Sequence, residues 1–450
     1  MKNIRETAFQ ILYKVLEEGE YSHLVLSRIL REEAEAPKRD RAFVTHLVEA
    51  TLEHRITIDY VLDKVSKTPV NKMKPVIRTI LRMSVSQMMY MDSVPDSAVC
   101  NEAVKLAKSK GFQGLSGFVN GVLRNVVRME GAWKKEEFYR EAGMEGVKYF
   151  SVRYSMPEWL CEYFVSTYGE KTAELILKGS GRNPKTTIRC NTSRIAEEKL
   201  IERLLKQGFC VEKGTYAKGA WYLSGYDTLD KIPEFQEGLF QVQDESSMLV
   251  AELAGLKKND LVIDVCSAPG GKALHAANLL TECGGGQVIA RDVSEKKTDL
   301  IKENALRLKA SNVTIQVKDA LEIDETLLGK ADVVIADLPC SGIGIMAKKP
   351  EIRYRIRPED QKELVQLQKQ MLSVVHRYVK PGGILMYSTC TINKEENEEN
   401  AKEICEKYGF VPELDKERLP EKLRSESEFL QLLPGVHACD GFFIARLRKR

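Results

Sequence analysis

The second half of the chain repeats one pattern, in which a hydrophobic run is followed by a short loop and an amphipathic segment. The pattern starts near residue 236, and its first complete unit reads "LVIDVCSAPGGKALHAANLL". Four further hydrophobic runs follow: "GGQVIARDV", "NVTIQVKDA", "ADVVIADLPCS" and "GGILMYSTC". Strands linked through helices pair in parallel and are buried on both faces. Residues 236–450 are therefore predicted to form a doubly wound α/β domain.

The first half of the chain has a different period. Runs such as "RETAFQILYKVLEE", "HLVLSRILREE" and "VIRTILRMSVSQMMYM" place apolar residues three or four positions apart, which is typical of amphipathic helices. Residues 1–140 are therefore predicted to be an all-α bundle. Residues 141–235 mix helical stretches with short strand-like runs such as "KTTIRCN" and "AWYLSG", and this alternation predicts a linker followed by a small α+β module.

The composition limits the class of protein. No apolar stretch reaches the roughly 18 residues of a membrane helix, and the start alternates charged and apolar residues, so a cytoplasmic protein is expected. The ten cysteines include no C-x-x-C pair, which argues against a disulfide framework or a metal site. The net charge is only +3, so any binding of nucleic acid has to rest on local basic surfaces.

The loop after the first strand of the α/β domain is the first candidate site. Ligands of doubly wound sheets bind beyond the carboxyl ends of the strands, and small residues let the backbone approach them closely. The loop lacks the G-x-G-x-x-G pattern of dinucleotide sites, and it lacks the G-K-[ST] of phosphate-binding loops because Ala273 follows the lysine. The candidate residues are Cys266, Ser267, Ala268, Pro269, Gly270, Gly271 and Lys272.

Acidic residues end the following strands. Asp292 is placed to accept hydrogen bonds from ribose hydroxyls, and Asp319 is placed to accept one from an adenine amine. Each acid alone could be an ordinary turn residue, but successive strand ends that carry Asp or Cys beside small residues favour an adenosine site without a phosphate. S-adenosylmethionine is therefore the predicted cofactor, with Asp337 as a further contact.

Three segments, "DVCSAPGGK", "ADLPCSGIG" and "YSTCTINKEENE", together resemble the RNA cytosine-C5 methyltransferase family. The helical segments "RAFVTHLVEATLEHR" and "SGFVNGVLRNVVR" resemble the NusB-type RNA-binding domain. The resemblance covers nearly the whole chain. It implies a NusB-like domain, then the small α+β module, then a Rossmann-like S-adenosylmethionine-dependent methyltransferase domain that acts on RNA, with small-subunit (16S) rRNA as the expected substrate.

The resemblance also assigns roles to the two cysteines that follow strands. Cytosine C5 is a poor nucleophile, so a thiolate first adds to C6, and a second group is needed when the proton leaves C5 and the thiolate is eliminated. By the family pattern Cys390 matches the nucleophile and Cys340 matches the residue that assists product release. Asp337 matches a position beside the cofactor and the base, and Lys272 is expected to aid the same pocket. The other cysteines, including Cys266, are expected to be unreactive.

A basic segment lies between Cys340 and the next helix. Lys348, Lys349, Arg353 and Arg355 in "MAKKPEIRYRIRPED" are candidates for contacts with RNA phosphates, with Tyr354 available for stacking. A solvated loop explains the same residues equally well. Near the C-terminus, two apolar runs around "GVHACDG" predict a β-hairpin in which His437 serves the turn.

Other functions remain open. "DLPC" is close to the [ND]-P-P-[YF] strand end of amino-group methyltransferases, but those enzymes stack an aromatic residue where Cys340 stands. The substrate could be tRNA or another rRNA site. The chain could also be a non-catalytic RNA-binding factor built on a methyltransferase scaffold. A monomer without bound metal is expected.

Overall fold

The computed structural model describes residues 3–33, 35–140, 144–181 and 185–450, and the chain divides into two compact units. The first unit is helical and comprises residues 1–182 together with 346–355, and the second comprises 183–345 and 356–450. Each unit is described by itself. Among the described residues, no helix combines the length and apolar character needed to cross a membrane.

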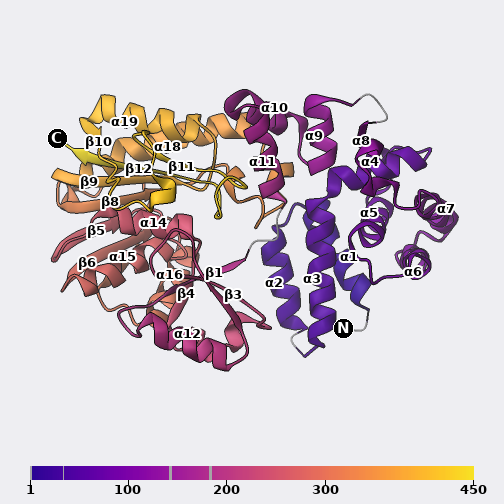
Figure 1. Ribbon diagram of the computed structural model, residues 1–450, viewed down its shortest axis with the longest axis horizontal. Coiled ribbons are helices and arrows are strands. Elements are labelled where there is room, and N and C mark those ends of the chain that lie inside the picture. Colours follow the sequence, from indigo (N-terminus) through magenta and orange to yellow (C-terminus); the bar gives the residue numbers. More distant parts are fainter. Residues whose placement is uncertain (1–2, 34, 141–143, 182–184) are drawn as a thin grey trace. The chain divides into compact units, whose positions relative to one another are not determined.

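The helical unit is built around one central helix, α5 (Pro75–Tyr90), which is buried on nearly every side. It contacts α1, α3, α4, α6 and α7 (Figure 1). The buried Arg82 on this helix donates two hydrogen bonds, of 2.7 and 2.6 Å, to Asp59. The other helices of this unit are α1 (Ile4–Leu16), α2 (Ser22–Glu32), α3 (Lys38–Glu53), α4 (Arg55–Val65), α6 (Asp96–Ser109), α7 (Ser116–Val127), α8 (Glu136–Arg140), α9 (Gly146–Tyr154), α10 (Glu158–Tyr168), α11 (Glu170–Ser180) and α17 (Ile352–Arg355).

The all-α bundle expected over residues 1–140 is present, but helical packing continues beyond it. Helix α9 contacts α4, and α10 and α11 pack on α9 and on each other. The expected boundary near 140 therefore falls inside the helical unit. Residues 141–143 at that boundary lie outside the described residues.

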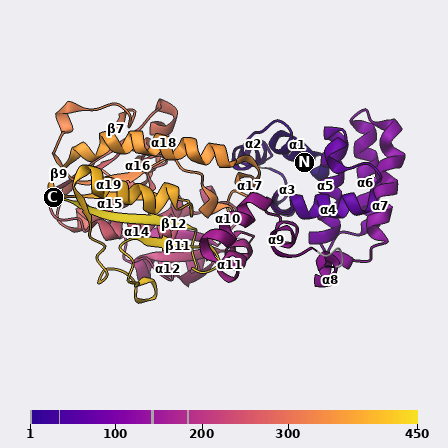
Figure 2. The same ribbon diagram turned by 90° about the horizontal axis from the view of Figure 1, so that it is seen from above.

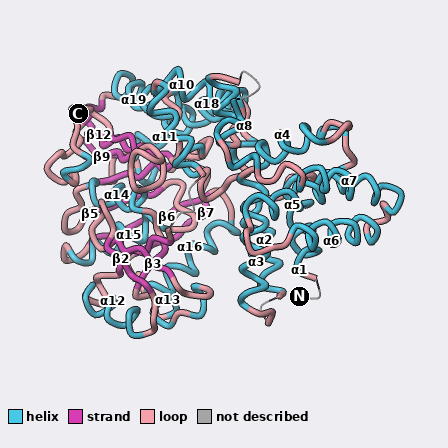
Figure 3. The backbone as a smooth tube through the Cα atoms, turned by 45° about the vertical axis from the view of Figure 1, so that its right-hand side comes forward, coloured by secondary structure: helices cyan, strands magenta, loops and turns pink. Residues whose placement is uncertain are grey.

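The second unit begins with a small antiparallel sheet in the order β2-β3-β1-β4. Its core combines Ile188, Leu223 and Phe240 from the strands with Leu200 and Leu204 from α12 (Glu197–Lys206). The last strand lies beyond residue 235, so the small module extends further than expected. Figure 3 shows this sheet beside α12 and α13. Its elements are β1 (Thr186–Cys190), β2 (Cys210–Lys213), β3 (Ala220–Ser224), α13 (Pro233–Gln236) and β4 (Phe240–Val242).

The large sheet has the order β10-β12-β9-β8-β5-β6-β7, and β11 pairs with β12. Strands β5 to β9 pair in parallel as expected, whereas β10, β11 and β12 pair antiparallel. The sheet is therefore mixed, and the expected C-terminal hairpin is β11 with β12. The strands are β5 (Asp260–Asp264), β6 (Gly286–Asp292), β7 (Val313–Val317), β8 (Ala331–Asp337), β9 (Val379–Thr389), β10 (Phe410–Pro412), β11 (Leu430–Leu432) and β12 (Phe442–Lys449).

Helices cover both faces of the large sheet. Successive strand residues point to opposite faces, and Val262 accordingly joins one hydrophobic cluster while Ile263 joins the other. The first cluster includes residues of α14 (Glu245–Ala254), α15 (Gly271–Glu282) and α16 (Glu295–Leu308), and the second includes residues of α18 (Pro358–Val375) and α19 (Asn400–Tyr408). The two layers can be followed in Figures 1 and 2. The Rossmann-like fold predicted from the sequence is thus confirmed.

Candidate active site

The carboxyl ends of neighbouring parallel strands form one edge of the large sheet. Asp264 ends β5, Asp292 ends β6 and Asp337 ends β8. Cys390 directly follows β9. The chain order reverses at β5, which pairs with β6 on one side and β8 on the other. Open α/β sheets bind ligands at such a point, so the structure brings the candidate residues to the place where a ligand is expected.

The two candidate cysteines lie side by side. The Sγ atoms of Cys340 and Cys390 are 3.3 Å apart, and both thiols are free and half-buried. The hydrogen bond with Cys390, together with burial, raises the pKa of Cys340 well above its usual range. Cys340 therefore holds its proton at neutral pH. A protonated thiol in contact with a second sulfur can donate a hydrogen bond to it.

Lys272 and Asp337 form an ion pair at the same edge. Nζ of Lys272 donates to Oδ2 of Asp337 at 2.7 Å, and Oγ of Ser388 donates to Oδ1 at 2.8 Å. Burial alone lowers the pKa of Lys272, but the neighbouring acids, chiefly Asp337, outweigh burial and raise it overall. Lys272 is therefore a fixed positive charge near the cysteines. Sequence reasoning did not identify Ser388 as the second partner of Asp337.

Asp264 is fully buried beneath this pair. Neither of its carboxylate oxygens has a hydrogen bond of good geometry among the described residues. Burial raises its pKa to about 7, and Lys272, the Ser267 hydroxyl and the backbone of Cys266 oppose the shift only in part. A buried carboxyl group without a well-formed hydrogen bond is costly, and a pKa perturbed in this way is typical of a functional site. The family resemblance did not single out Asp264.

The loop expected to hold the cofactor is fastened to β6. The backbone N–H of Ser267 donates to the carbonyl of Arg291 at 2.8 Å, and that of Ala268 donates to Asp292 Oδ2 at 2.9 Å. Gly270 has a φ of +103°, and a Cβ there would lie 3.0 Å from a methyl group of Leu274. The loop therefore runs close to α15 in a conformation that suits glycine.

The other candidates for contact with the cofactor, Asp292, Asp319 and Cys266, differ in how many partners they already have. Oδ1 of Asp292 accepts from the N–H of Val293 at 2.8 Å and lies 3.1 Å from Nζ of Lys297. Among the described residues, Oδ2 accepts from Ala268 alone and therefore keeps a second lone pair for a hydroxyl. Asp319 lies two residues beyond β7 and accepts from the N–H of Leu321 at 2.9 Å, so it orders the turn. Burial raises the pKa of Cys266, which suits an unreactive wall residue. The loop and the acids together fit S-adenosylmethionine, because carboxylates meet its hydroxyls and amines while small residues admit it.

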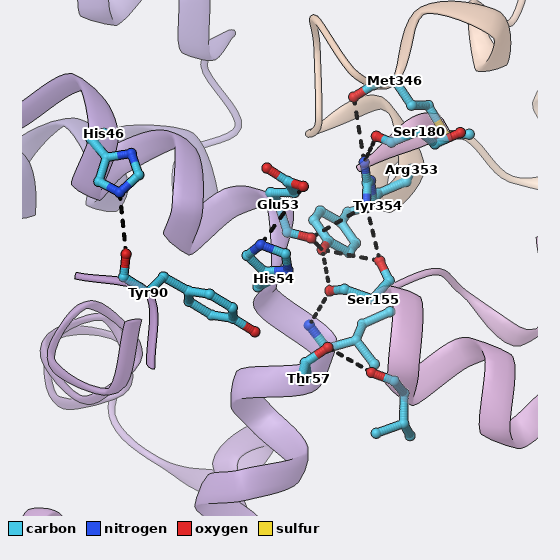
Figure 4. A network of polar contacts seen from close by, with 12 residues as sticks. His46, Glu53, His54, Thr57, Tyr90, Ser155, Ser180, Met346, Arg353 and Tyr354 are labelled. Atoms are coloured by element: carbon cyan, nitrogen blue, oxygen red, sulfur yellow. Dashed lines mark hydrogen bonds and ion pairs between the residues drawn. The ribbon is translucent and has the colours of Figure 1, made fainter. Parts of the chain in front are cut away.

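The structure gives part of the basic segment a different role from the expected contact with RNA. Arg353 is buried in the helical unit, where its guanidinium donates to the carbonyls of Glu53, Ser155, Ser180 and Met346 (Figure 4). Four carbonyl partners leave it no open surface for a phosphate, so the expectation for Arg353 is corrected.

The neighbours of Arg353 are also tied to the helical unit. Tyr354 does not offer a free ring, because the Arg55 guanidinium lies 3.8 Å from its centre. Arg355 donates to the carbonyl of Glu20 and lies over the ring of Tyr21. Lys348 is exposed and Lys349 is half-buried, so an RNA contact by these two lysines stays a prediction.

Known proteins resemble the chain along its whole length. The model "16S rRNA methyltransferase RsmB/F" matches residues 251–448, the NusB family matches 2–128, and an RsmF/B-like ferredoxin-like domain matches 156–226. The probable ribosomal RNA small subunit methyltransferase B of Bacillus subtilis (strain 168) is 36% identical over 453 residues, covering 100% of this chain and 99% of the relative. Its namesake from Synechocystis sp. is 30% identical, covering 100% of both.

Two solved structures are also similar. The crystal structure of PH0851 has a TM-score of 0.82 and 25% identity, covering 99% of both chains. NSun6 from Pyrococcus horikoshii, crystallised with the S-adenosylmethionine analogue SFG, has a TM-score of 0.58 and 25% identity, covering 65% of this chain and 98% of its own.

The strand order, the glycine-containing loop and the acids at the strand ends define a Rossmann-like domain, and the family match over residues 251–448 shows that this domain is a methyltransferase. A NusB-like helical domain and a ferredoxin-like module precede that domain. The chain belongs to the 16S rRNA methyltransferase RsmB/F family.

Proposed function

We propose that this protein transfers a methyl group from S-adenosylmethionine to C5 of a cytosine in 16S rRNA through a covalent cysteine adduct. The observation that carries the proposal is the pair of free thiols, 3.3 Å apart, beside the Lys272–Asp337 ion pair. A methyltransferase that acts on an amino group has no use for a second sulfur at this place. The rRNA substrate is taken from the names of the relatives.

Cys390 is the proposed nucleophile, as the family pattern assigns it. Its thiolate adds to C6 of the cytosine, the C5–C6 double bond opens, and C5 becomes electron-rich. The cofactor supplies an electrophilic methyl group when bound. The carboxylates Asp292 and Asp319, with the loop from Cys266 to Gly271, are the groups that would hold that cofactor.

Cys340 assists the second half of the reaction. After methylation a water molecule takes the C5 proton, the electron pair of that C–H bond re-forms the C5–C6 double bond, and the Cys390–C6 bond breaks so that Cys390 departs as a thiolate. A thiol in contact with Cys390 is placed to stabilise that departing thiolate by hydrogen bonding. Removal of Cys340 is therefore expected to slow release more than attack.

Asp337 and Lys272 orient the base. Asp337 accepts from both Lys272 and Ser388, which fixes its carboxylate at the strand end. A fixed carboxylate can accept a hydrogen bond from the cytosine amino group. A target cytosine has to be unpaired or flipped out to reach this edge. Lys348 and Lys349 of the helical unit are proposed to contact phosphates of the RNA. The protein is proposed to act as a monomer in the cytoplasm.

Methyl transfer with labelled S-adenosylmethionine tests the proposal. Unmodified 16S rRNA is the substrate, tRNA is the comparison, and the position of the label is mapped to the base. Wild type is expected to produce 5-methylcytosine in 16S rRNA, Cys390→Ala is expected to lose activity by at least about a hundredfold, and Cys340→Ala is expected to accumulate a protein–RNA adduct. Cofactor binding without transfer to any RNA would instead support a non-catalytic RNA-binding factor.

A further inference from the structure

The turn Glu395–Glu399 follows Cys390 closely and leads directly into α19. Its sequence, "KEENEEN", looks like a solvated charged face, yet Glu396 and Asn397 are 0% and 1% exposed. The turn is wound more widely than an α-helix, as π-turns are. Burying a carboxylate and an amide in adjacent positions costs free energy unless both groups are hydrogen-bonded.

Glu396 holds the loop that carries Cys340. Its Oε2 accepts from the backbone N–H of Ser341 at 2.8 Å and from Nε2 of Gln368 at 3.0 Å. The same nitrogen of Gln368 donates to the carbonyl of Pro339 at 2.8 Å. The backbone groups immediately before and after Cys340 are therefore both fastened, and Cys340 is fixed between them.

Asn397 does the same for Cys390. Its Oδ1 accepts from the hydroxyl of Thr389, and its Nδ2 donates to the carbonyl of Thr391 at 3.0 Å. Nδ2 also donates to Oε1 of Gln431 at 2.8 Å, which ties the amide to β11. The residues on both sides of Cys390 are thus attached to one amide group.

The two loops are also joined to each other. The hydroxyls of Ser341 and Thr391 are 2.7 Å apart, close to the two sulfur atoms. Each cysteine nevertheless has its own anchor. Among the described residues, the hydrogen bonds of the Glu396 side chain go to the surroundings of Cys340, and those of the Asn397 side chain go to the neighbours of Cys390 and to Gln431.

We propose that Glu396 and Asn397 are positioning residues with separate tasks, Glu396 with Gln368 for Cys340 and Asn397 for Cys390. The inference rests on the proposed function, in which the two cysteines serve different steps. Loss of the Glu396 anchor impairs breakdown of the covalent adduct, and loss of the Asn397 anchor impairs its formation. A purely structural role predicts no such division, because both variants would lower stability and slow both steps together.

Single-turnover kinetics separate the two tasks. Glu396→Leu removes the acceptor of Ser341 and Gln368, Gln368→Leu removes the donor to Pro339, and Asn397→Leu removes all three bonds of the amide. Adduct formation and adduct decay are measured with excess enzyme, 16S rRNA and S-adenosylmethionine. Misplacement of a reacting group by about 1 Å costs up to a hundredfold, so the affected step is expected to slow at least about tenfold.

We expect the two sets of variants to slow different steps. Glu396→Leu and Gln368→Leu accumulate adduct as Cys340→Ala does, with formation within about twofold of wild type and unchanged KM for RNA. Asn397→Leu forms adduct slowly and accumulates none. Gln368→Leu provides the test of the Cys340 anchor if Glu396→Leu lowers stability too far. Matched controls are Glu399→Leu and Gln366→Leu, which make the same changes at exposed positions of the same elements and should behave as wild type.

The inference is overturned if the two sets of variants slow the same step or slow both steps equally. A different result, in which wild type neither methylates nor forms an adduct, would overturn the proposed function and the division of tasks with it. The two failures are distinguishable because the first leaves wild type and Cys340→Ala behaving as proposed.

Discussion

At the scale of single residues, the site depends on buried charges that few local contacts neutralise. Lys272 and Asp337 have each other, whereas Asp264 has no hydrogen bond of good geometry among the described residues. Burial raises the pKa of Asp264 to about 7, well above the ordinary value of about 3.9 for aspartate. The folded protein therefore keeps a proton that the unfolded chain releases between about pH 4 and pH 7. This carboxyl group consequently lowers stability as the pH rises through that window.

Asp264→Asn should accordingly stabilise the protein more at high pH than at low pH. The amide does not titrate, so the free energy of unfolding of the variant relative to wild type should increase by about 1–3 kcal/mol between pH 4.5 and pH 8. Urea unfolding at several pH values measures this difference. The control is Asp299→Asn at an exposed position, and an equal difference at both pH values for Asp264→Asn would contradict the assignment.

Some of these residues could be found from the sequence and others could not. Asp337 ends a strand, Cys390 and Cys340 follow strands closely, and Lys272 lies at the start of the helix after the first loop. The ends of these strands and the start of this helix are visible in the hydrophobic pattern. Glu396 looks solvated because acidic residues surround it in the sequence. Its burial results from packing against α18 and β9, and the local sequence pattern does not show these contacts. The only local signal of this burial is that two asparagines, Asn397 and Asn400, interrupt the acidic residues after Cys390.

At the scale of elements, the site depends on close approach of the loops at the end of the sheet. Gly344 follows the Cys340 loop, and its N–H donates to the carbonyl of Cys390 at 3.2 Å while its own carbonyl accepts from Gly441 at 2.9 Å. A Cβ at Gly344 would overlap the backbone of Gly441. The loops after β8 and β9 and the start of β12 therefore meet without room for a side chain.

Gly344→Ala should displace these loops. Overpacking of this kind costs about 1–3 kcal/mol, and the displacement should also slow adduct formation because the Cys390 carbonyl is one of the contacts. Gly121→Ala is a suitable control, since a Cβ there meets nothing within 4 Å. Urea unfolding together with the methyl-transfer assay checks the prediction, which is wrong if Gly344→Ala matches wild type in both.

The pattern of hydrophobic runs predicted the parallel strands correctly, because buried strands between helices have few alternatives. It predicted the hairpin of β11 and β12, but it did not predict that β12 also pairs antiparallel with β9 and β10, because pairing direction depends on how the chain returns to the sheet. It also placed the end of the small module too early. Strand β4 is only three residues long, too short to show a period of two.

At the scale of the whole molecule, the helical unit is completed by a segment from far along the chain. Residues 346–355 belong to that unit although they directly follow the Cys340 loop in sequence. Arg353 satisfies four carbonyls there, and Glu351 accepts from the N–H of Ser22 at 3.0 Å. The amino-acid pattern of this segment resembles an RNA-binding loop, and only the tertiary structure shows where its arginines go.

Arg353→Leu should destabilise the helical unit. Carbonyls left without donors cost about 1–3 kcal/mol each when buried, and partial rearrangement offsets some of this, so a loss of about 2–4 kcal/mol is expected. Lys348→Ala should leave stability within about 0.5 kcal/mol and should instead weaken RNA binding in a salt-dependent manner. Denaturation and RNA-binding titrations distinguish the two, and the assignments fail if their effects are exchanged.

The central claim is that Cys390 and not Cys340 attacks the cytosine. It is tested most directly with 16S rRNA that contains 5-fluorocytosine, because fluorine at C5 cannot leave as a cation and the adduct is trapped. The trapped protein is digested, and the peptide linked to RNA is identified by mass spectrometry. The account predicts that the RNA is attached to Cys390 and that the adduct persists in Cys340→Ala, whereas attachment to Cys340 would contradict it.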